Sequence, residues 1–262
     1  MRSVVVEQAI HAPLERIWRA CSSASGLRAW LADDVAGDIA PGAQLVLSWS
    51  ALGVAIPLRV EIAELAGPSA RLALGAEDSQ LLIEAAEGHV TLTHRADFDD
   101  DERAGTLSSW RLSLGTLAHY LEQHDAEPRS VHWAVARAKA SIEDAHAFFT
   151  LPGAQSGWLT RTGSGTGIGE VGSEVALDLA WGSRLTGRVL SHTSPRDVLF
   201  SWRESNESLL ALRTLPSPDT AGERLLIATW SSWGPKQPEI IAQNLNAALA
   251  RLSRILERRA TA

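Results

Sequence analysis

The chain has 262 residues and a formal net charge of -7, with 45% hydrophobic and 21% charged residues. This composition is ordinary for a folded globular protein, and the length suits one large domain or two of ordinary size. The acidic balance argues against a general nucleic-acid-binding protein, because such a protein presents a basic face to phosphates.

The single cysteine, Cys21, excludes an intramolecular disulfide and a cysteine zinc cluster. The chain therefore suits a reducing cytoplasm, and we expect Cys21 to be structural. No segment approaches the roughly 20 apolar residues of a membrane-spanning helix.

Alternating β-branched residues predict a first strand at Val4–Ile10. A helix is predicted after it, because Pro13 suits a first helical turn and Leu14, Ile17 and Cys21 share one face. A second short helix ends at "LRAWL".

Alternation and Gly or Pro turns then predict an antiparallel meander. Its strands are Ala43–Trp49, Ile56–Leu65, Ser69–Leu74, Ser79–Glu87 and Gly88–Phe98. We expect an acidic loop at Asp99–Gly105 and a long helix at Leu107–Gln123. A matching helix is predicted at Pro238–Arg258, with apolar residues spaced by three and four.

The same order of landmarks occurs twice, with a period of about 125 residues. "RAWL" at 28–31 answers "SGWL" at 156–159, and "LSSW" at 107–110 answers "WSSW" at 230–233. The polar join at Gln123–Ser130 is typical of a linker. The sequence therefore predicts two tandem domains, at residues 1–125 and 130–262.

Several short motifs resemble a known family. They are "I-x-A-P-x-x-x-I-W" from Ile10 to Trp18, "WL" after the second helix, "PG" before the next strand, and the long final helix. The chain is similar to START-like helix-grip proteins of the SRPBCC superfamily, and within them to the activator of heat shock protein 90 ATPase homologue-like domain. The resemblance implies an α+β fold of two helix-grip domains, each a curved antiparallel sheet wrapped around a long C-terminal helix. Copy two departs from the pattern, since Ser141 replaces the helix-starting proline.

"GIGEVG" at residues 167–172 matches the dinucleotide-binding pattern G-x-G-x-x-G. That fingerprint needs a helix directly after the glycines, because the helix N-terminus holds the pyrophosphate. Here an alternating strand follows, at Ser173–Trp181. The glycines are better interpreted as a loop at a pocket rim or as a long hairpin.

The ten tryptophans are the richest signal, against one Tyr and four Phe. They fill the core or, together, line an apolar cavity under the long helix. The predicted cavity residues are Trp30, Trp49, Arg59, Trp110, Leu114, Leu117, Trp158, Trp181, Arg188, Trp202 and Trp233. We assign no catalytic residue, metal ligand or cofactor.

The sequence favours a protein that binds a small apolar or amphipathic ligand, with no nucleic-acid partner. Two alternatives stay open. The resemblance implies a co-chaperone-like activator of a heat-shock ATPase, with a chaperone or regulatory protein as partner. It also implies a cyclase- or aromatase-like enzyme that uses the helix-grip cavity, although no paired acid and base is visible in the sequence.

Overall fold

A computed structural model describes residues 1–124, 126–162, 165–235 and 239–260. The chain divides into two compact units, unit 1 at Met1–Arg129 and unit 2 at Ser130–Ala262. Each is described by itself.

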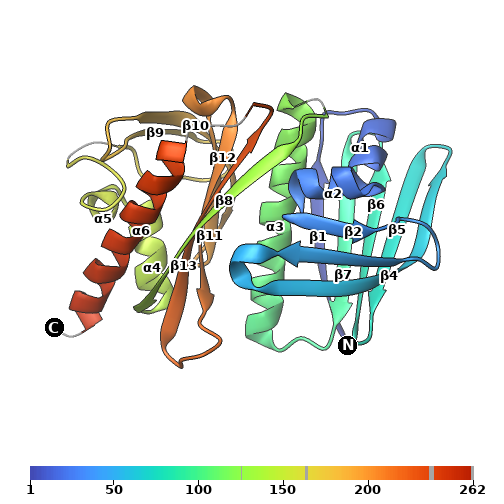
Figure 1. Cartoon of the computed structure of the whole chain (residues 1–262), viewed down its shortest axis with the longest axis horizontal. Coiled ribbons are helices and arrows are strands. Elements are labelled where there is room, and N and C mark those ends of the chain that lie inside the picture. Colours follow the sequence, from blue (N-terminus) through green and yellow to red (C-terminus); the bar gives the residue numbers. More distant parts are fainter. Residues whose placement is uncertain (125, 163–164, 236–238, 261–262) are drawn as a thin grey trace. The chain divides into compact units, whose positions relative to one another are not determined.

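Unit 1 contains one antiparallel sheet and three α-helices (Figure 1). Its strands are β1 (Arg2–Ala9), β2 (Asp34–Gly37), β3 (Gln44–Trp49), β4 (Val54–Ala66), β5 (Ser69–Ala76), β6 (Ser79–Ala86) and β7 (His89–Ala96). Its helices are α1 (Leu14–Cys21), α2 (Ala24–Trp30), the 3-10 turn η1 (Ser50–Leu52) and α3 (Asp100–Gln123). The strand order is β1-β7-β6-β5-β4-β3-β2.

Alternation along the strands builds the core of unit 1. Val4 and Val6 on β1, and Val90 and Leu92 on β7, are buried because they share one face of the sheet. Helix α3 contacts β1 and buries Leu114, Leu117 and Leu121. The long helix therefore covers the apolar face of the sheet.

Unit 2 repeats this order without a counterpart of β2 among its named strands. Its strands are β8 (Arg129–Lys139), β9 (Glu174–Asp178), β10 (Arg184–Thr193), β11 (Asp197–Trp202), β12 (Ser208–Pro216) and β13 (Glu223–Trp233). Its helices are α4 (Ile142–Thr150), α5 (Pro152–Gln155), the 3-10 turn η2 (Arg203–Ser205) and α6 (Glu239–Ala260). The strand order is β8-β13-β12-β11-β10-β9.

The two sheets bend at equivalent places. In β4 the pairing register shifts between Val60 and Ile62, and in β10 it shifts between Val189 and Ser191. Such bulges bend a strand and increase its twist. The Val60 carbonyl accepts from the Gly42 N–H, and the Val189 carbonyl accepts from the Gly172 N–H, both at 2.8 Å. The predicted α+β architecture, a bent antiparallel sheet with a long C-terminal helix in each half, is confirmed.

One predicted landmark of the repeat is wrong. "LSSW" at 107–110 lies inside helix α3, whereas "WSSW" at 230–233 forms the end of strand β13. The four letters match in part, but their backbones differ, so these serines are not equivalent.

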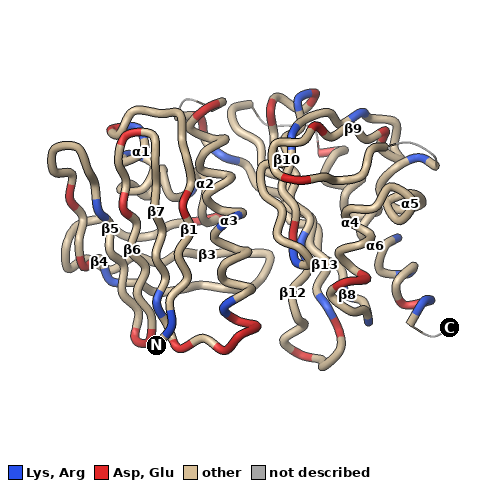
Figure 2. The backbone as a smooth tube through the Cα atoms, turned by 180° about the vertical axis from the view of Figure 1, so that it is seen from behind, with Lys and Arg blue, Asp and Glu red and all other residues tan. Residues whose placement is uncertain are grey.

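The acidic loop predicted at Asp99–Gly105 is also wrong, because α3 begins at Asp100. Asp99 is the N-cap: its side chain accepts from the Glu102 N–H at 2.8 Å, and the Glu102 carboxylate accepts from the Asp99 N–H at 3.0 Å. The first turn of α3 is acidic (red in Figure 2), which favours the positive end of the helix dipole.

Helix α6 matches its prediction closely, although the predicted start at Pro238 lies outside the described residues. In the described part of the chain, no helix is both long and apolar enough to cross a membrane.

Candidate functional site

Two of the predicted tryptophans are core residues with defined hydrogen-bond partners. Trp30 and Trp158 are each 1% exposed. The Trp30 Nε1–H donates to the Ala20 carbonyl at 3.0 Å, and the Trp158 Nε1–H donates to the Phe148 carbonyl at 3.1 Å. Both bonds span ten residues, so each indole fixes the first helix of its unit to the segment after it.

The other predicted tryptophans lie at different depths. Trp202 is buried and donates to the Arg184 carbonyl at 3.0 Å, and half-buried Trp49 donates to the Leu31 carbonyl at 3.1 Å. Half-buried Trp181 has a buried Nε1 with no hydrogen-bond partner among the described residues. These indoles therefore lie close to the ends of strands, and the strands belong to two different units.

Trp110 belongs to an aromatic cluster in unit 1. Its Nε1–H donates to His94 Nδ1 at 3.1 Å, and the His94 ring meets Phe98 edge-on at 5.1 Å. Burial lowers the pKa of His94. Because Nδ1 accepts, His94 in its neutral form carries its hydrogen on Nε2.

Trp233 lies on the other face of its sheet. Trp230 belongs to the core cluster that α6 covers, and a separation of three residues places Trp233 on the opposite side of β13. Trp233 is buried there, at 1% exposure. It is therefore not a neighbour of the indoles under α6.

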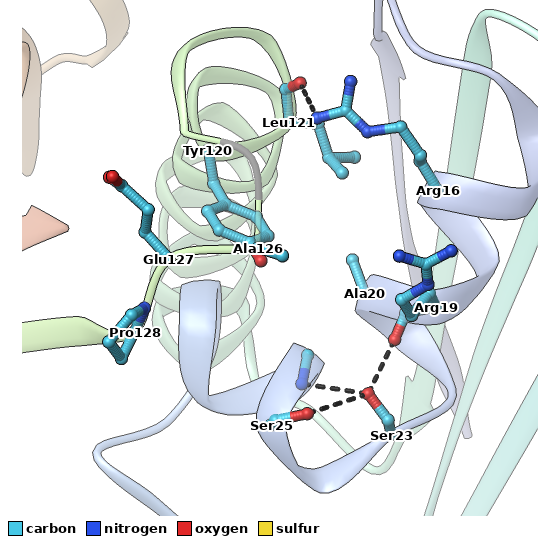
Figure 3. A pocket seen from close by; sticks show the side chains of 11 residues that line it. Arg16, Arg19, Ala20, Ser23, Ser25, Tyr120, Leu121, Ala126, Glu127 and Pro128 are labelled. Atoms are coloured by element: carbon cyan, nitrogen blue, oxygen red, sulfur yellow. Dashed lines mark hydrogen bonds between the residues drawn. The ribbon is translucent and has the colours of Figure 1, made fainter. Parts of the chain in front are cut away.

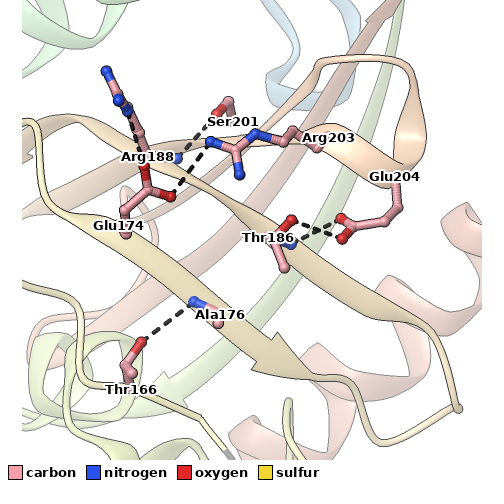
Figure 4. A network of polar contacts seen from close by, with 8 residues as sticks. All are labelled: Thr166, Glu174, Ala176, Thr186, Arg188, Ser201, Arg203 and Glu204. Atoms are coloured by element: carbon pink, nitrogen blue, oxygen red, sulfur yellow. Dashed lines mark hydrogen bonds and ion pairs between the residues drawn. The ribbon is translucent and has the colours of Figure 1, made fainter.

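The two predicted arginines are on the surface. Arg59 is exposed on β4, and Arg188 is exposed on β10. The Arg188 Nε–H donates to Glu174 at 3.0 Å, and Arg203 approaches the same carboxylate at 3.4 Å (Figure 4). The hydrogen bond from Arg188 lowers the pKa of Glu174. Both guanidinium groups are therefore on the surface, and neither lines a cavity under the long helix of its unit.

The predicted residues are thus not brought together around one space. Leu114 and Leu117 fill the core of unit 1, and three cavities among the described residues have no tryptophan in their lining. The candidate site is a different place, which sequence reasoning missed.

A pocket of about 170 Å³ lies in unit 1 between α1, α2 and the C-terminal end of α3. Its walls combine cations, hydroxyls and apolar groups. They are formed by Arg16, Arg19, Ala20, Ser23, Ser25, Gly26, Tyr120, Leu121, Ala126, Glu127 and Pro128. Figure 3 shows Arg16 and Arg19 on one side of this gap, and Tyr120 and Glu127 on the other. We call it the α1–α2 pocket.

Short-range bonds shape the α1–α2 pocket. Ser23 is the N-cap of α2: its Oγ accepts from the Gly26 N–H at 3.0 Å and donates to the Arg19 carbonyl at 2.8 Å. The Arg16 guanidinium donates to the Leu121 carbonyl at 2.8 Å, close to the end of α3. These bonds connect α1 to α2 and to the end of α3, and so fix the walls of the pocket relative to one another.

The pocket carries opposite charges in unequal number. Arg16 and Arg19 supply two positive charges, and Glu127 supplies one negative charge. Glu127 Oε2 lies 3.4 Å from Nδ1 of His124, which is charged only when protonated. The arrangement favours an anionic group on the α1 side.

The residue at one equivalent position beside this pocket differs in size between the two units. The two Trp-to-carbonyl bonds make Ala20 equivalent to Phe148. Phe148 is 6% exposed, and the Arg259 guanidinium lies over its ring at 5.2 Å. The small Ala20 side chain lines the α1–α2 pocket, whereas its counterpart Phe148 lies under the Arg259 guanidinium. The alignment of "RAWL" with "SGWL" places Ala20 opposite Phe148, so the sequence itself contains this difference.

The glycine-rich segment is followed by strand β9, as predicted, and not by a helix. A dinucleotide site is therefore excluded there. Among the described residues, no three His, Cys, Asp or Glu side chains lie close enough to hold a metal ion.

No family model matches the chain. No curated protein matches it.

Solved structures do match. The di-domain ARO/CYC protein BexL of the BE-7585A biosynthetic pathway is 12% identical, with 98% of this chain and 99% of BexL covered and a TM-score of 0.44. StfQ of the steffimycin pathway, also a di-domain ARO/CYC protein, is 10% identical, with both chains fully covered and a TM-score of 0.44. Aha1 of Colwellia psychrerythraea is 18% identical, with 47% of this chain and 97% of Aha1 covered and a TM-score of 0.40.

These likenesses concern the fold alone. The structure itself shows the arrangement that the motifs predicted, an antiparallel sheet followed by a long C-terminal helix, once in each unit.

Proposed function

We propose that the chain binds a small amphipathic molecule and that the α1–α2 pocket of unit 1 is the binding site. The observation that supports this most directly is an open pocket whose lining combines two arginines with Ala20, Tyr120 and Leu121. A ring or short chain would contact the apolar part, while an acidic head group would face the guanidinium groups.

The size of the pocket limits the ligand. Drug-sized ligands occupy roughly 300–1,000 Å³, whereas the α1–α2 pocket offers about 170 Å³. The ligand, or the part of it that enters, is therefore on the scale of one substituted ring.

The lining groups suit binding better than catalysis. An arginine stays protonated and does not act as a base. The Ser23 hydroxyl already donates to the Arg19 carbonyl, and burial raises the pKa of the neighbouring Cys21 thiol to about 12. These groups orient a bound anion and are not prepared to attack it.

Calorimetric titration of the full chain with benzoate tests the proposal. Benzoate combines one ring with one carboxylate, and we expect a Kd below about 1 mM, given the usual free energy per ligand atom. Benzyl alcohol, which lacks the charge, is expected to bind at least about tenfold more weakly.

Three variants locate the benzoate site. Ala20→Phe fills the pocket as Phe148 does in unit 2, and it should abolish binding. Arg19→Gln should weaken benzoate and leave benzyl alcohol unchanged. Ala51→Phe adds the same ring at an exposed site and serves as the matched control. Binding that survives Ala20→Phe would refute the α1–α2 pocket as the site.

We further propose that the two units are separate domains, with limits at 1–125 and 130–262. The co-chaperone-like and cyclase-like alternatives remain predictions. A pull-down with a heat-shock ATPase tests the first, and conversion of an aromatic polyketide precursor tests the second.

A further inference from the structure

Residues 165–172 of unit 2, which we call the glycine lid, lie where unit 1 has its edge strand β2. The lid makes contact with β9, because the Thr166 N–H donates to the Ala176 carbonyl at 3.2 Å and the Ala176 N–H donates to Thr166 Oγ1 at 3.3 Å. In unit 1 a full strand, Asp34–Gly37, pairs with β3 instead. Unit 2 thus closes this edge with a loop.

The centre of the lid is inserted into the core of unit 2. Ile168 is 7% exposed and belongs to the buried apolar cluster of that unit. Its N–H donates to the Thr150 carbonyl at 2.9 Å, at the end of α4. Gly167 permits this approach, since a Cβ there would lie 3.2 Å from the Pro152 ring.

A pair of histidines connects to the lid at Gly169, the residue after Ile168. His192 on β10 bonds the Gly169 carbonyl through Nδ1 at 3.0 Å, and its Nε2 lies 3.1 Å from Nε2 of His146 on α4. The two rings are stacked with centroids 5.2 Å apart, and His146 is 7% exposed. The pair therefore connects α4, β10 and the lid.

The Gly169 carbonyl determines which ring nitrogens of the two histidines carry a hydrogen. A carbonyl oxygen only accepts, so His192 carries its hydrogen on Nδ1. In the neutral pair His192 Nε2 is bare and accepts from the Nε2–H of His146. One added proton can lie between the two Nε2 atoms if His146 moves its own hydrogen to Nδ1. A second proton places hydrogens on both facing nitrogens.

We propose that the His146–His192 pair is a proton-sensitive latch, which holds the glycine lid closed over the core of unit 2 when neutral and releases it when both rings are protonated.

The surroundings of His146 favour its neutral form while the lid is closed. Burial and, as the smaller cause, the charge of His192 together lower the pKa of His146 to about 4. Helix α4 contacts α5, β11, β12 and α6. The charged groups on these elements, on α4 itself and on the lid are Asp197, Arg213, Glu239, Arg251, Arg254, Glu257, Arg258, Arg259, Glu143, Asp144 and Glu170. Among the described groups, only His192 shifts the pKa of His146 through its charge.

The direction of the pH effect follows from linkage. A released histidine titrates near 6.5, so the open lid binds more protons than the closed lid as the pH falls below that value. One pKa unit is a factor of ten in the equilibrium. We therefore expect the open fraction to rise at least about tenfold between pH 7.5 and 4.5.

Hydrogen exchange of the full chain, followed by mass spectrometry and corrected for the intrinsic rate at each pH, tests the latch. The Ile168 amide reports the lid, and β12 (Ser208–Pro216) reports the whole unit. We expect Ile168 exchange to accelerate at least about tenfold at pH 4.5 while β12 stays protected. Equal acceleration in β12, or none in the lid, would overturn the proposal.

Variants separate the latch from general acid sensitivity. His146→Gln keeps an Nε2–H donor that does not titrate, so the lid should remain protected at pH 4.5. His192→Ala removes the bond to Gly169 and should expose the lid at both pH values. His11→Gln changes an exposed histidine of unit 1 and should behave as the unaltered chain. An unchanged pH response in His146→Gln would contradict the latch.

Discussion

The first helices of the two units are built on the same bond and differ in one side chain. In each unit an indole N–H reaches the carbonyl ten residues before it, which belongs to Ala20 in unit 1 and to Phe148 in unit 2. Beside Ala20 there is a pocket, whereas Phe148 packs under the guanidinium of Arg259. The two units therefore keep the same indole-to-carbonyl bond while the side chain beside it differs in size.

The largest expected loss of stability comes from removing the Phe148 ring of unit 2. Phe148→Ala removes a ring that is 6% exposed and its contact with Arg259. Truncating a buried phenylalanine costs about 3–5 kcal/mol. Urea unfolding followed by fluorescence should show this loss, and the conservative Phe148→Leu should lose clearly less. Equal stability in the unaltered chain and Phe148→Ala would mean that the ring does not support unit 2.

The shared bond can be broken in both units separately. Trp30→Phe and Trp158→Phe each leave a buried carbonyl without its indole donor. An unpaired buried group costs about 1–3 kcal/mol, so the two variants should be destabilised by similar amounts. Denaturation of both proteins measures this. A large effect in one unit and none in the other would show that the two bonds are not equivalent.

A feature particular to unit 1 is the capping box of α3. Asp99→Ala removes the acceptor for the Glu102 N–H. Loss of such a cap costs about 0.5–2 kcal/mol, which thermal unfolding resolves. Asp78→Ala, at an exposed turn, is the matched control and should change the melting temperature little. If both variants melt alike, Asp99 is not an effective cap.

The smallest expected effect concerns thiol reactivity. Cys21 is buried, and burial raises its pKa to about 12, so almost no thiolate exists at pH 8. We expect the folded chain to react with Ellman's reagent only as fast as it unfolds, and to react fully in urea. Rapid reaction of the native protein would show that the end of α1 is open to solvent.

Local patterns predicted most of the fold. Alternation located the strands, and apolar spacing of three and four located α1, α3 and α6. The acidic stretch is helical and not a loop, because Asp99 and Glu102 form a capping box that starts α3. The sequence shows this signature as an acidic residue followed three residues later by Glu.

The site was harder to predict, because it depends on which face each side chain occupies. Trp230 and Trp233 share a motif and lie on opposite faces of β13. The partners of Trp30 and Trp158 are backbone carbonyls, which no side-chain pattern reports. The alignment of the two copies pairs Ala20 with Phe148, but it does not show that Ala20 lines a pocket.

The most direct test of the account is a two-dimensional NMR titration of the full chain with benzoate, following the amides of Gly26 and Ala126 on the pocket wall. We predict saturable shifts at these positions in the unaltered chain, and no shifts there in Ala20→Phe. Shifts that persist in Ala20→Phe, or that appear only elsewhere in the chain, would contradict the account.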